Sequence, residues 1–461
     1  MQEDAAAALR QAADWARTRA GAARRLARAA LGLDRMRIGV AGLSGAGKTV
    51  FTTSLVHALV HGGSRRADLP LFAAALGAAR WRASVEPLPD LPPFPYAAHL
   101  DGLTSDPPAW PQPTRAPCGL RLELVAEEPG ARRVAIEIVD YPGEWLLDLD
   151  LLDLDYAAWS AAALERLQAH RGAAREAAGV WLGQALEAAD DAGACARVVG
   201  GYAATLSHLR AAGLSFLQPG ALLAPPAAPA PPPPAPLPAT LAGGPLYRAM
   251  AARFVAYRDG FVLPFRRDHL ARIDRQIVLV DLTGTLANGP EAFADARAAL
   301  AASLRAFRYR RIPGLDALRG RIARVLVAAT KIDHVATSQY LNARALLADA
   351  LAGSAWAGSI ARDRLRFEVL AAIRSTEDGW MRRDGAQRAA LRGVLRGPGG
   401  VLRMLVPSDV PPQAPAAADW PEGGFVYAQF APPDLRGHRA RPFPNVNLDK
   451  ALDHLVGDRL R

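Results

Sequence analysis

The 461-residue chain has only two cysteines, Cys118 and Cys195, and no run of 18 consecutive apolar residues. Two cysteines far apart in sequence provide neither a disulfide framework nor a metal-ligand pattern, which suits a reducing cytoplasm. The missing apolar run argues against a transmembrane helix. We therefore expect a cytoplasmic protein with no transmembrane segment of its own.

Blocks of consecutive lysine or arginine beyond short pairs are also missing, although the formal net charge is +10. The basic residues are spread along the chain among Ala, Leu and Asp, and no nucleic-acid-binding module is recognisable. We therefore expect no nucleic-acid partner. Hydrophobic residues make up 51% of the chain, enough for a sizeable core, and the length allows two or three domains.

Residues 1–33 form an arm rich in Ala and Arg. The acidic residues Glu3, Asp4 and Asp14 argue against an organellar targeting peptide. The arm is predicted to be an amphipathic helix that docks on the protein or on a partner. A helix bound to an anionic membrane surface stays open as an alternative, so peripheral contact with the inner membrane is part of the expected localisation.

Strand and helix patterns alternate on both sides of a long helical block. Apolar runs at 275–282, 323–330 and 366–373 are typical of buried parallel strands. Apolar and polar side chains alternate at 118–125 and 132–140, which predicts a two-strand ribbon. Residues 61–115 show little periodicity and are predicted to be mostly loops. The pattern predicts an α/β fold with a mostly parallel sheet flanked by helices and an inserted all-helical domain.

The expected boundaries divide the core into two parts. They are 34–149 and 272–400 for the core, 150–271 for the inserted helical domain, and 401–461 for a C-terminal extension that packs on the core. The proline run at 224–239 is predicted to be an extended, mobile linker, and a ligand for a proline-binding domain is the less favoured alternative.

The stretch GLSGAGKT, residues 42–49, lies between a strand pattern and a helix pattern and fits G-x-x-x-x-G-K-[ST]. Such a loop aims backbone N–H groups and a helix N-terminus at an anionic phosphate. Lys48 would reach the outer phosphates, and the Thr49 hydroxyl would ligate Mg²⁺. The predicted phosphate-binding residues are Gly42, Ser44, Gly45, Ala46, Gly47, Lys48, Thr49 and Val50.

A second motif, D-x-x-G, follows the strand at 132–140 and consists of Asp140 and Gly143. Asp140 would hold Mg²⁺ through water, and the Gly143 N–H would contact a γ-phosphate. Release of that γ-phosphate would break the contact and free the segment that follows Gly143. A threonine that closes over Mg²⁺ is expected before the strand at 118–125. Thr114 is the candidate, and Thr104 and Ser105 are alternatives.

The stretch ATKID supplies Thr330, Lys331 and Asp333, which resemble the guanine-binding N-K-x-D motif. An Asp carboxylate accepts hydrogen bonds from guanine N1–H and the exocyclic amine, and adenine lacks both donors in that geometry. The stem of Lys331 would cover the base, and Ile373 is the likeliest backbone donor to it. This order of motifs matches Ras-like GTPases, so the expected ligands are GTP or GDP with Mg²⁺.

Several stretches together resemble the bacterial YcjX-like P-loop proteins. They are GLSGAGKT, DYPGEWLLDL, WPQPTR, DRQIVLVDLTGTLANGPEAF, ATKID and RPFPNVNLDKALDHLVGDRL. The resemblance implies a predicted GTPase with a Ras-like core and a helical insertion, and a link to stress response. It also implies a protein partner, for which a membrane protein encoded nearby is the candidate.

Glu144 follows the D-x-x-G glycine, where many GTPases have a Gln that orients the attacking water. It is a candidate water-orienting base, and an outward-facing Glu at a helix N-terminus is the alternative. The candidate catalytic set is Lys48, Thr114, Gly143 and Glu144. Candidates for a charge-stabilising arginine are Arg115, Arg272 and Arg275.

The predicted function is a nucleotide-dependent switch that hydrolyses GTP slowly and needs a partner for faster turnover. Two alternatives stay open. One is a scaffold that binds nucleotide with negligible hydrolysis, which Glu144 in place of Gln favours. The other is a P-loop ATPase, which Asp333 opposes because adenine offers its carboxylate no donors.

Overall fold

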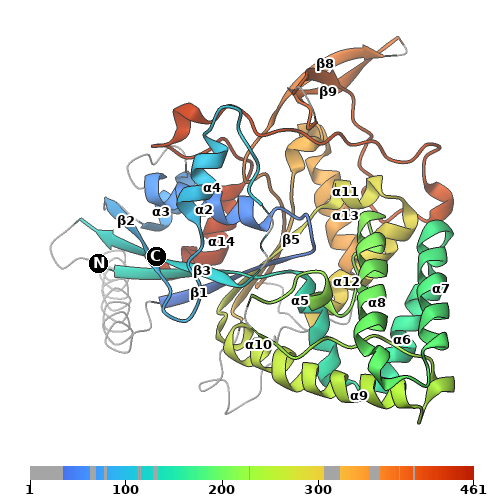
Figure 1. Cartoon of the computed structure of the whole chain (residues 1–461). Helices are drawn as coiled ribbons and strands as arrows, with labels where there is room; N and C mark the ends of the chain where they lie inside the picture. Colours follow the sequence, from blue (N-terminus) through green and yellow to red (C-terminus); the bar gives the residue numbers. More distant parts are fainter. Residues whose placement is uncertain are drawn as a thin grey trace, which may run out of the picture.

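A seven-stranded sheet forms the centre of the computed structural model (Figure 1). The structure describes residues 35–62, 69–76, 80–112, 114, 116–127, 133–227, 229–305, 322–352, 364–383, 385–397 and 400–460. The strands are β1 (Arg35–Gly42), β2 (Trp81–Pro87), β3 (Cys118–Ala126), β4 (Arg133–Asp140), β5 (Arg275–Val280), β6 (Arg324–Ala329) and β7 (Leu365–Val369).

The strand order in this sheet is β2-β3-β4-β1-β5-β6-β7. Strands β4, β1, β5, β6 and β7 run parallel, whereas β3 is antiparallel to β4 and β2 is antiparallel to β3. All residues of β5 are buried, as expected for a central parallel strand covered on both faces. The predicted fold class, a mostly parallel sheet flanked by helices, is confirmed.

Alternate residues of each strand point to opposite sides of the sheet, and both faces carry apolar side chains. Helices therefore cover both faces. One face packs against α2 (Lys48–Gly62) and α14 (Leu448–Leu460), with Ile38 and Leu452 in the shared core. The other face packs against α12 (Pro290–Arg305) and α13 (Tyr340–Ala352). The short helix α11 (Leu282–Ala287) begins at Asp281, whose carboxylate accepts from the Gly284 N–H at 2.9 Å.

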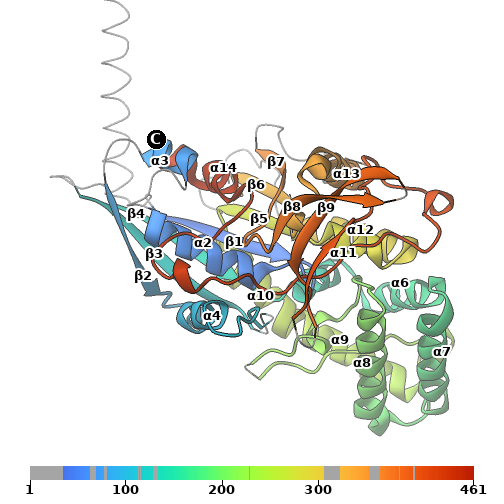
Figure 2. The same cartoon turned by 90° about the horizontal axis from the view of Figure 1, so that it is seen from above.

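A helical region joins β4 to β5 and lies at one end of the sheet (Figures 1 and 2). Asp155 caps its first long helix by accepting from the Ala158 N–H at 2.8 Å. Its helices are α5 (Glu144–Leu147), α6 (Tyr156–Ala169), α7 (Gly172–Glu187), α8 (Cys195–Ala211), α9 (Pro245–Tyr257) and α10 (Leu263–Asp268).

The described part of the proline run packs against this helical region. The Tyr156 hydroxyl donates to the Ala235 carbonyl at 2.9 Å, and the Ser160 hydroxyl bonds both the carbonyl and the N–H of Leu237 at 2.6 Å. Ala235 and Leu237 are buried. The predicted mobile linker is therefore wrong. An extended proline-rich segment has no internal hydrogen bonds, so its carbonyls are available to neighbouring side chains.

The prediction of mostly loops at 61–115 is also wrong. This stretch contains α3 (Pro70–Leu76), the edge strand β2 and α4 (Tyr96–Leu103). Trp81 is the only buried residue of β2, so this strand has no regular apolar alternation by which its sequence could be recognised.

A second sheet rises from the body of the protein (Figure 1). It has the strand order β10-β9-β8 and consists of β8 (Thr376–Arg383), β9 (Ala386–Val394) and β10 (Leu402–Leu405). Among the described residues, no helix combines the length and the apolar character that crossing a bilayer requires.

Candidate nucleotide-binding site

A cavity of about 270 Å³ lies where β1, β4, β6 and β7 end. It is lined by the segments that follow these strands, including residues 44–51, Glu144, Leu370 to Ile373, and Thr330, Lys331, Asp333 and His334. Open sheets of parallel strands bind their ligands at this edge, because the loops after neighbouring strands meet there. The cavity therefore brings together the motifs that lie far apart in the sequence.

The loop before α2 has the geometry of a phosphate cradle. Gly45 and Gly47 have φ angles of +78° and +83°, which glycine adopts without the steric cost that other residues incur. Ser44 to Val50 all line the cavity. The Lys48 Nζ atom donates to the Gly42 carbonyl at 2.9 Å, which keeps the ammonium group beside the loop. Gly42 thus positions Lys48, although it does not itself line the cavity.

Three oxygen-bearing side chains meet beside this loop. The Thr114 hydroxyl donates to Asp140 Oδ2 at 2.6 Å, and its oxygen lies 2.9 Å from the Thr49 hydroxyl. Since the Thr114 proton goes to Asp140, Thr49 must donate to Thr114. The predicted metal-binding residues Thr49, Thr114 and Asp140 are therefore neighbours in space.

The state of Asp140 suits a cation. Its side chain is fully buried, and no described residue hydrogen-bonds its Oδ1 atom. Burial raises the pKa of Asp140 to about 6, although the Lys48 charge and the Thr114 hydrogen bond both act to lower it. Buried oxygens without a partner are costly unless something binds them. One carboxylate and two hydroxyls are also ligands of the type that Mg²⁺ prefers, so these residues fit that ion.

The alternatives to Thr114 bond elsewhere. The Thr104 hydroxyl donates to the Leu100 carbonyl at 2.8 Å, and the Ser105 hydroxyl donates to the carbonyls of Gly102 and Pro107 at 2.8 Å. Neither residue lines the cavity, whereas Thr114 does.

Gly143 lies directly against the phosphate loop. A methyl group in place of its hydrogen would lie 1.9 Å from the Gly42 carbonyl oxygen and 3.2 Å from Lys48 Nζ. Only glycine allows this approach. Glu144 begins α5 and is half-buried in the cavity wall, and no described residue hydrogen-bonds its carboxylate. The Glu144 side chain is therefore available to a ligand or to water.

In the part of the cavity wall that follows β6, Asp333 is held by a residue that sequence reasoning missed. The backbone N–H and the hydroxyl of Ser375 both donate to Asp333 Oδ2, at 2.7 and 2.6 Å. Thr330 Oγ1 donates to the Val280 carbonyl at 3.2 Å, which ties the start of this loop to β5. Ile373 also lines this end of the cavity.

Lys331 has a left-handed backbone with φ of +54°, and its Nζ atom lies 2.5 Å from Asp281 Oδ2. Because the ammonium group pairs with the carboxylate that follows β5, the aliphatic stem of Lys331 is held along the cavity wall. Asp281 was not predicted. Its position directly after an apolar strand was the available signal.

Three further lining residues were missed, and hydrogen bonds tie the segments that carry them to one another. Trp110 Nε1 donates to the Phe430 carbonyl at 3.0 Å, and the Arg396 N–H donates to the Gln429 carbonyl at 2.9 Å. Trp110, Arg396 and Phe430 all line the cavity. No local sequence motif marks them, because they come from three segments that only the tertiary structure brings together.

The described arginine candidates lie away from the phosphate loop. Arg275 is the first residue of β5, in register with Ile38, and it pairs with Asp458 at 2.9 Å. Arg272 precedes it and pairs with Asp90 at 3.0 Å. The loop begins where β1 ends, at Gly42, so neither side chain faces it. Arg115 lies outside the described residues.

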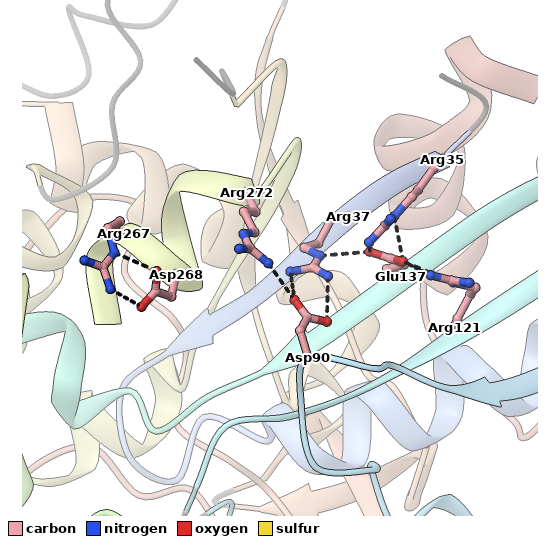
Figure 3. A network of polar contacts seen from close by, with 8 residues as sticks. All are labelled: Arg35, Arg37, Asp90, Arg121, Glu137, Arg267, Asp268 and Arg272. Atoms are coloured by element: carbon pink, nitrogen blue, oxygen red, sulfur yellow. Dashed lines mark hydrogen bonds and ion pairs between the residues drawn. The ribbon is translucent and has the colours of Figure 1, made fainter. Parts of the chain in front are cut away.

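Arg272 instead joins a polar network near the beginning of β1 (Figure 3). Arg37 binds both Asp90 and Glu137 at 2.9 Å. Burial alone would raise the pKa of Glu137, but hydrogen bonds from Arg35, Arg37 and Arg121 hold it below its ordinary value. This network contributes to the structure and is separate from the cavity.

Comparison with known proteins identifies the family. Residues 36–460 match the model of the YcjX-like family, DUF463. The chain belongs to this family. It is 35% identical to the Ras-like GTPase YcjX of Escherichia coli (strain K12), over 93% of this chain and 97% of that protein. It is 32% identical to the Ras-like GTPase YcjX of Shewanella oneidensis (strain MR-1), over 92% and 94% of the two chains. The YcjX-like resemblance predicted from the sequence is confirmed.

Proposed function

We propose that the chain binds guanine nucleotide together with Mg²⁺ and hydrolyses GTP slowly, as a nucleotide-dependent switch. Its main support is one cavity that is lined by both Lys48 and Asp333. The two residues are far apart in sequence, and one suits phosphates while the other suits a guanine base. Both relatives carry the name Ras-like GTPase, which agrees with this assignment.

Selectivity for guanine would come from Asp333. Its carboxylate would accept from the base N1–H and the exocyclic amine, with Ser375 holding the carboxylate in place. Adenine presents no donors in that arrangement, so its binding would leave a buried carboxylate oxygen unpaired. Ile373 is proposed as the backbone donor to the base.

For hydrolysis, Lys48 would stabilise the outer phosphates and the Gly143 N–H would donate to the γ-phosphate. Mg²⁺, held by Thr49, Thr114 and Asp140, would neutralise negative charge on the phosphates. Glu144 would orient the attacking water. A carboxylate beside a γ-phosphate is repelled unless a cation offsets it. Since neither Arg272 nor Arg275 lies at this end of the sheet, we expect slow turnover without a partner.

A second candidate is a scaffold that binds nucleotide without switching. One observation favours it: the segment after Gly143 is tightly bound to the helical region. Trp145 Nε1 donates to the Ala224 carbonyl at 2.7 Å, and the Gly220 N–H donates to Asp148 at 2.8 Å. A segment held by such buried hydrogen bonds resists the release that a switch requires. The P-loop ATPase alternative is opposed by Asp333.

The family resemblance extends the proposal to a protein partner, with a nearby-encoded membrane protein as the candidate, and to a role in bacterial stress response. A cytoplasmic protein in peripheral contact with the inner membrane would suit such a partner. Cross-linking in cells that carry either the unaltered chain or Lys48→Ala tests whether a partner binds according to nucleotide state.

Titration of the purified chain with GTP, GDP and ATP in the presence of Mg²⁺ tests the central proposal, followed by measurement of phosphate release. We expect guanine nucleotides to bind at least tenfold more tightly, about 1.4 kcal/mol, and phosphate to appear slowly. Glu144→Ala should lower release with little effect on affinity. Lys48→Ala should abolish binding. Equal affinity for ATP would refute the assignment of Asp333, and binding without release would favour the scaffold.

A further inference from the structure

The hairpin formed by β8 and β9 extends away from the body of the protein (Figure 1). Strand β10 pairs with β9 only from Leu391 to Val394. Residues 380–383 and 385–389, named here the hairpin tip, therefore lie beyond the third strand as a two-strand ribbon. Most described residues of this ribbon are exposed, so it is open to a partner outside the chain.

Apolar side chains occur on both faces of the hairpin tip. Trp380 is 65% exposed, although a tryptophan normally buries most of its surface. Its neighbour Met381 is half-buried and points to the other face, since successive strand residues alternate. A rigid protein partner would cover one of these faces and leave the other in water.

The charge of the hairpin tip is positive. The sequence from 380 to 389 contains three arginines and one aspartate. Arg382 and Arg388 are exposed, and neither forms an ion pair with any described residue. The acidic residues of β8, Glu377 and Asp378, lie nearer the body and already pair with arginines, at 3.6 and 2.8 Å. The tip therefore offers cationic groups to an anionic partner.

We propose that the hairpin tip binds the surface of an anionic lipid bilayer. Arg382 and Arg388 bind lipid phosphates, and Trp380 and Met381 enter the interfacial region. Tryptophan is enriched at membrane interfaces, and anionic lipids attract nearby arginines. A fluid headgroup layer surrounds a narrow ribbon and so covers both of its faces. Single-stranded nucleic acid needs a platform of stacking aromatics, and the tip has one aromatic residue.

The root of the same hairpin contacts the nucleotide cavity. Ser375 directly precedes β8 and holds Asp333, and Arg396, two residues after β9, lines the cavity. The tip itself lies outside the cavity. We therefore expect bilayer binding with or without nucleotide, so its test stands apart from that of GTP binding.

Sedimentation of the full chain with phosphatidylcholine vesicles, with and without phosphatidylglycerol, tests the proposal. We expect binding to the anionic vesicles that weakens as salt is added. The double variant R382E/R388E should lower the partition coefficient about tenfold or more. Trp380→Ser should lower it severalfold with no change in net charge. The matched control is R175E/R248E, which makes the same change in charge at exposed arginines of α7 and α9.

Each other outcome overturns the proposal. If the unaltered chain does not bind, the tip is not a membrane site. If R382E/R388E binds as well as the unaltered chain, the arm at 1–33 or another surface carries the binding. If the control falls as far as the tip variant, net charge alone is responsible. If single-stranded RNA displaces the vesicles and loses binding in R382E/R388E, the tip is an RNA site. Thermal unfolding of each variant verifies that it folds.

Discussion

Gly220, in the helical region, packs so closely on Glu144 that a methyl group at Gly220 would lie 2.1 Å from the Glu144 carbonyl oxygen. Glu144 itself follows Gly143, which lies against the phosphate loop. The path from the expected γ-phosphate to the helical region is therefore only two residues long. If loss of a phosphate moves Gly143, the contact between Glu144 and Gly220 is the first part of the helical region to be displaced.

Gly220→Ala tests how tightly this contact is packed. The added methyl group cannot be accommodated without moving the backbone of Glu144, so we expect the free energy of unfolding to fall by about 1–3 kcal/mol. Urea denaturation measures it. The control is Gly200→Ala in α8, where nothing lies within 4 Å of the added methyl group, and there we expect a gain of up to ~1 kcal/mol. Equal results for the two variants would refute a close contact at Gly220.

Asp148 makes the stability of the same region depend on pH. Burial raises its pKa to about 7 from an ordinary 3.8, although hydrogen bonds from Tyr257 and Gly220 act to lower it. Between about pH 4 and pH 7 the folded chain keeps a proton that the unfolded chain releases. The contribution of Asp148 to stability therefore falls as pH rises through this window, by at most about 1.4 kcal/mol per pH unit, and is constant above it.

Asp148→Asn should remove this contribution, because the amide does not titrate. Denaturant unfolding from pH 5 to pH 8 measures the slope of stability against pH, which should be flatter in the variant than in the unaltered chain. Asp190→Asn changes an exposed aspartate of the same region and should keep the original slope. A slope that is unaltered in Asp148→Asn would mean that another group titrates.

The parallel strands and the motifs that follow them could be predicted from the sequence, because each of these is a local pattern. The apolar run of β5 and the glycine spacing around Lys48 are visible within ten residues. The carboxyl ends of parallel strands then meet at one edge, so the proximity of Lys48 and Asp140 follows from topology. The order of motifs also placed a Mg²⁺-binding threonine before β3, which led to the prediction of Thr114.

What could not be predicted depends on contacts between distant segments. Trp110 and Phe430 are 320 residues apart, yet one hydrogen bond joins them in the cavity wall. The proline run at 224–239 has a composition typical of disordered linkers, yet Tyr156 and Ser160 fix its carbonyls. The hairpin of β8 and β9 was missed because Gly379, Ala389 and Ala390 interrupt any apolar alternation.

Trp110→Phe tests the hydrogen bond between two segments that line the proposed nucleotide cavity. The phenyl ring keeps most of the apolar contact but cannot donate to the Phe430 carbonyl. One hydrogen bond contributes about 1 kcal/mol, so we expect nucleotide release to become about three to ten times faster. Displacement of a fluorescent GDP analogue by excess GDP measures the rate. Tyr427→Phe removes a hydrogen bond to the Asp409 carbonyl outside the cavity and should leave the rate unchanged. An unchanged rate in Trp110→Phe would show that release does not require this hydrogen bond to break.

Asp333→Asn tests which base the cavity selects. The amide replaces one accepting oxygen with a donor, which would then face a donor of guanine, so we expect GTP affinity to fall about 100-fold, or ~2.7 kcal/mol. Xanthosine triphosphate, whose C2 carbonyl accepts from an amide, should recover part of this loss. Ser375→Ala keeps the backbone donor to Asp333 and loses only the hydroxyl, so we expect a smaller decrease, about three- to tenfold. Asp378→Asn, outside the cavity, should bind GTP as the unaltered chain does. If Asp333→Asn keeps the full preference for GTP over ATP, another group selects the base and Asp333 does not bind it.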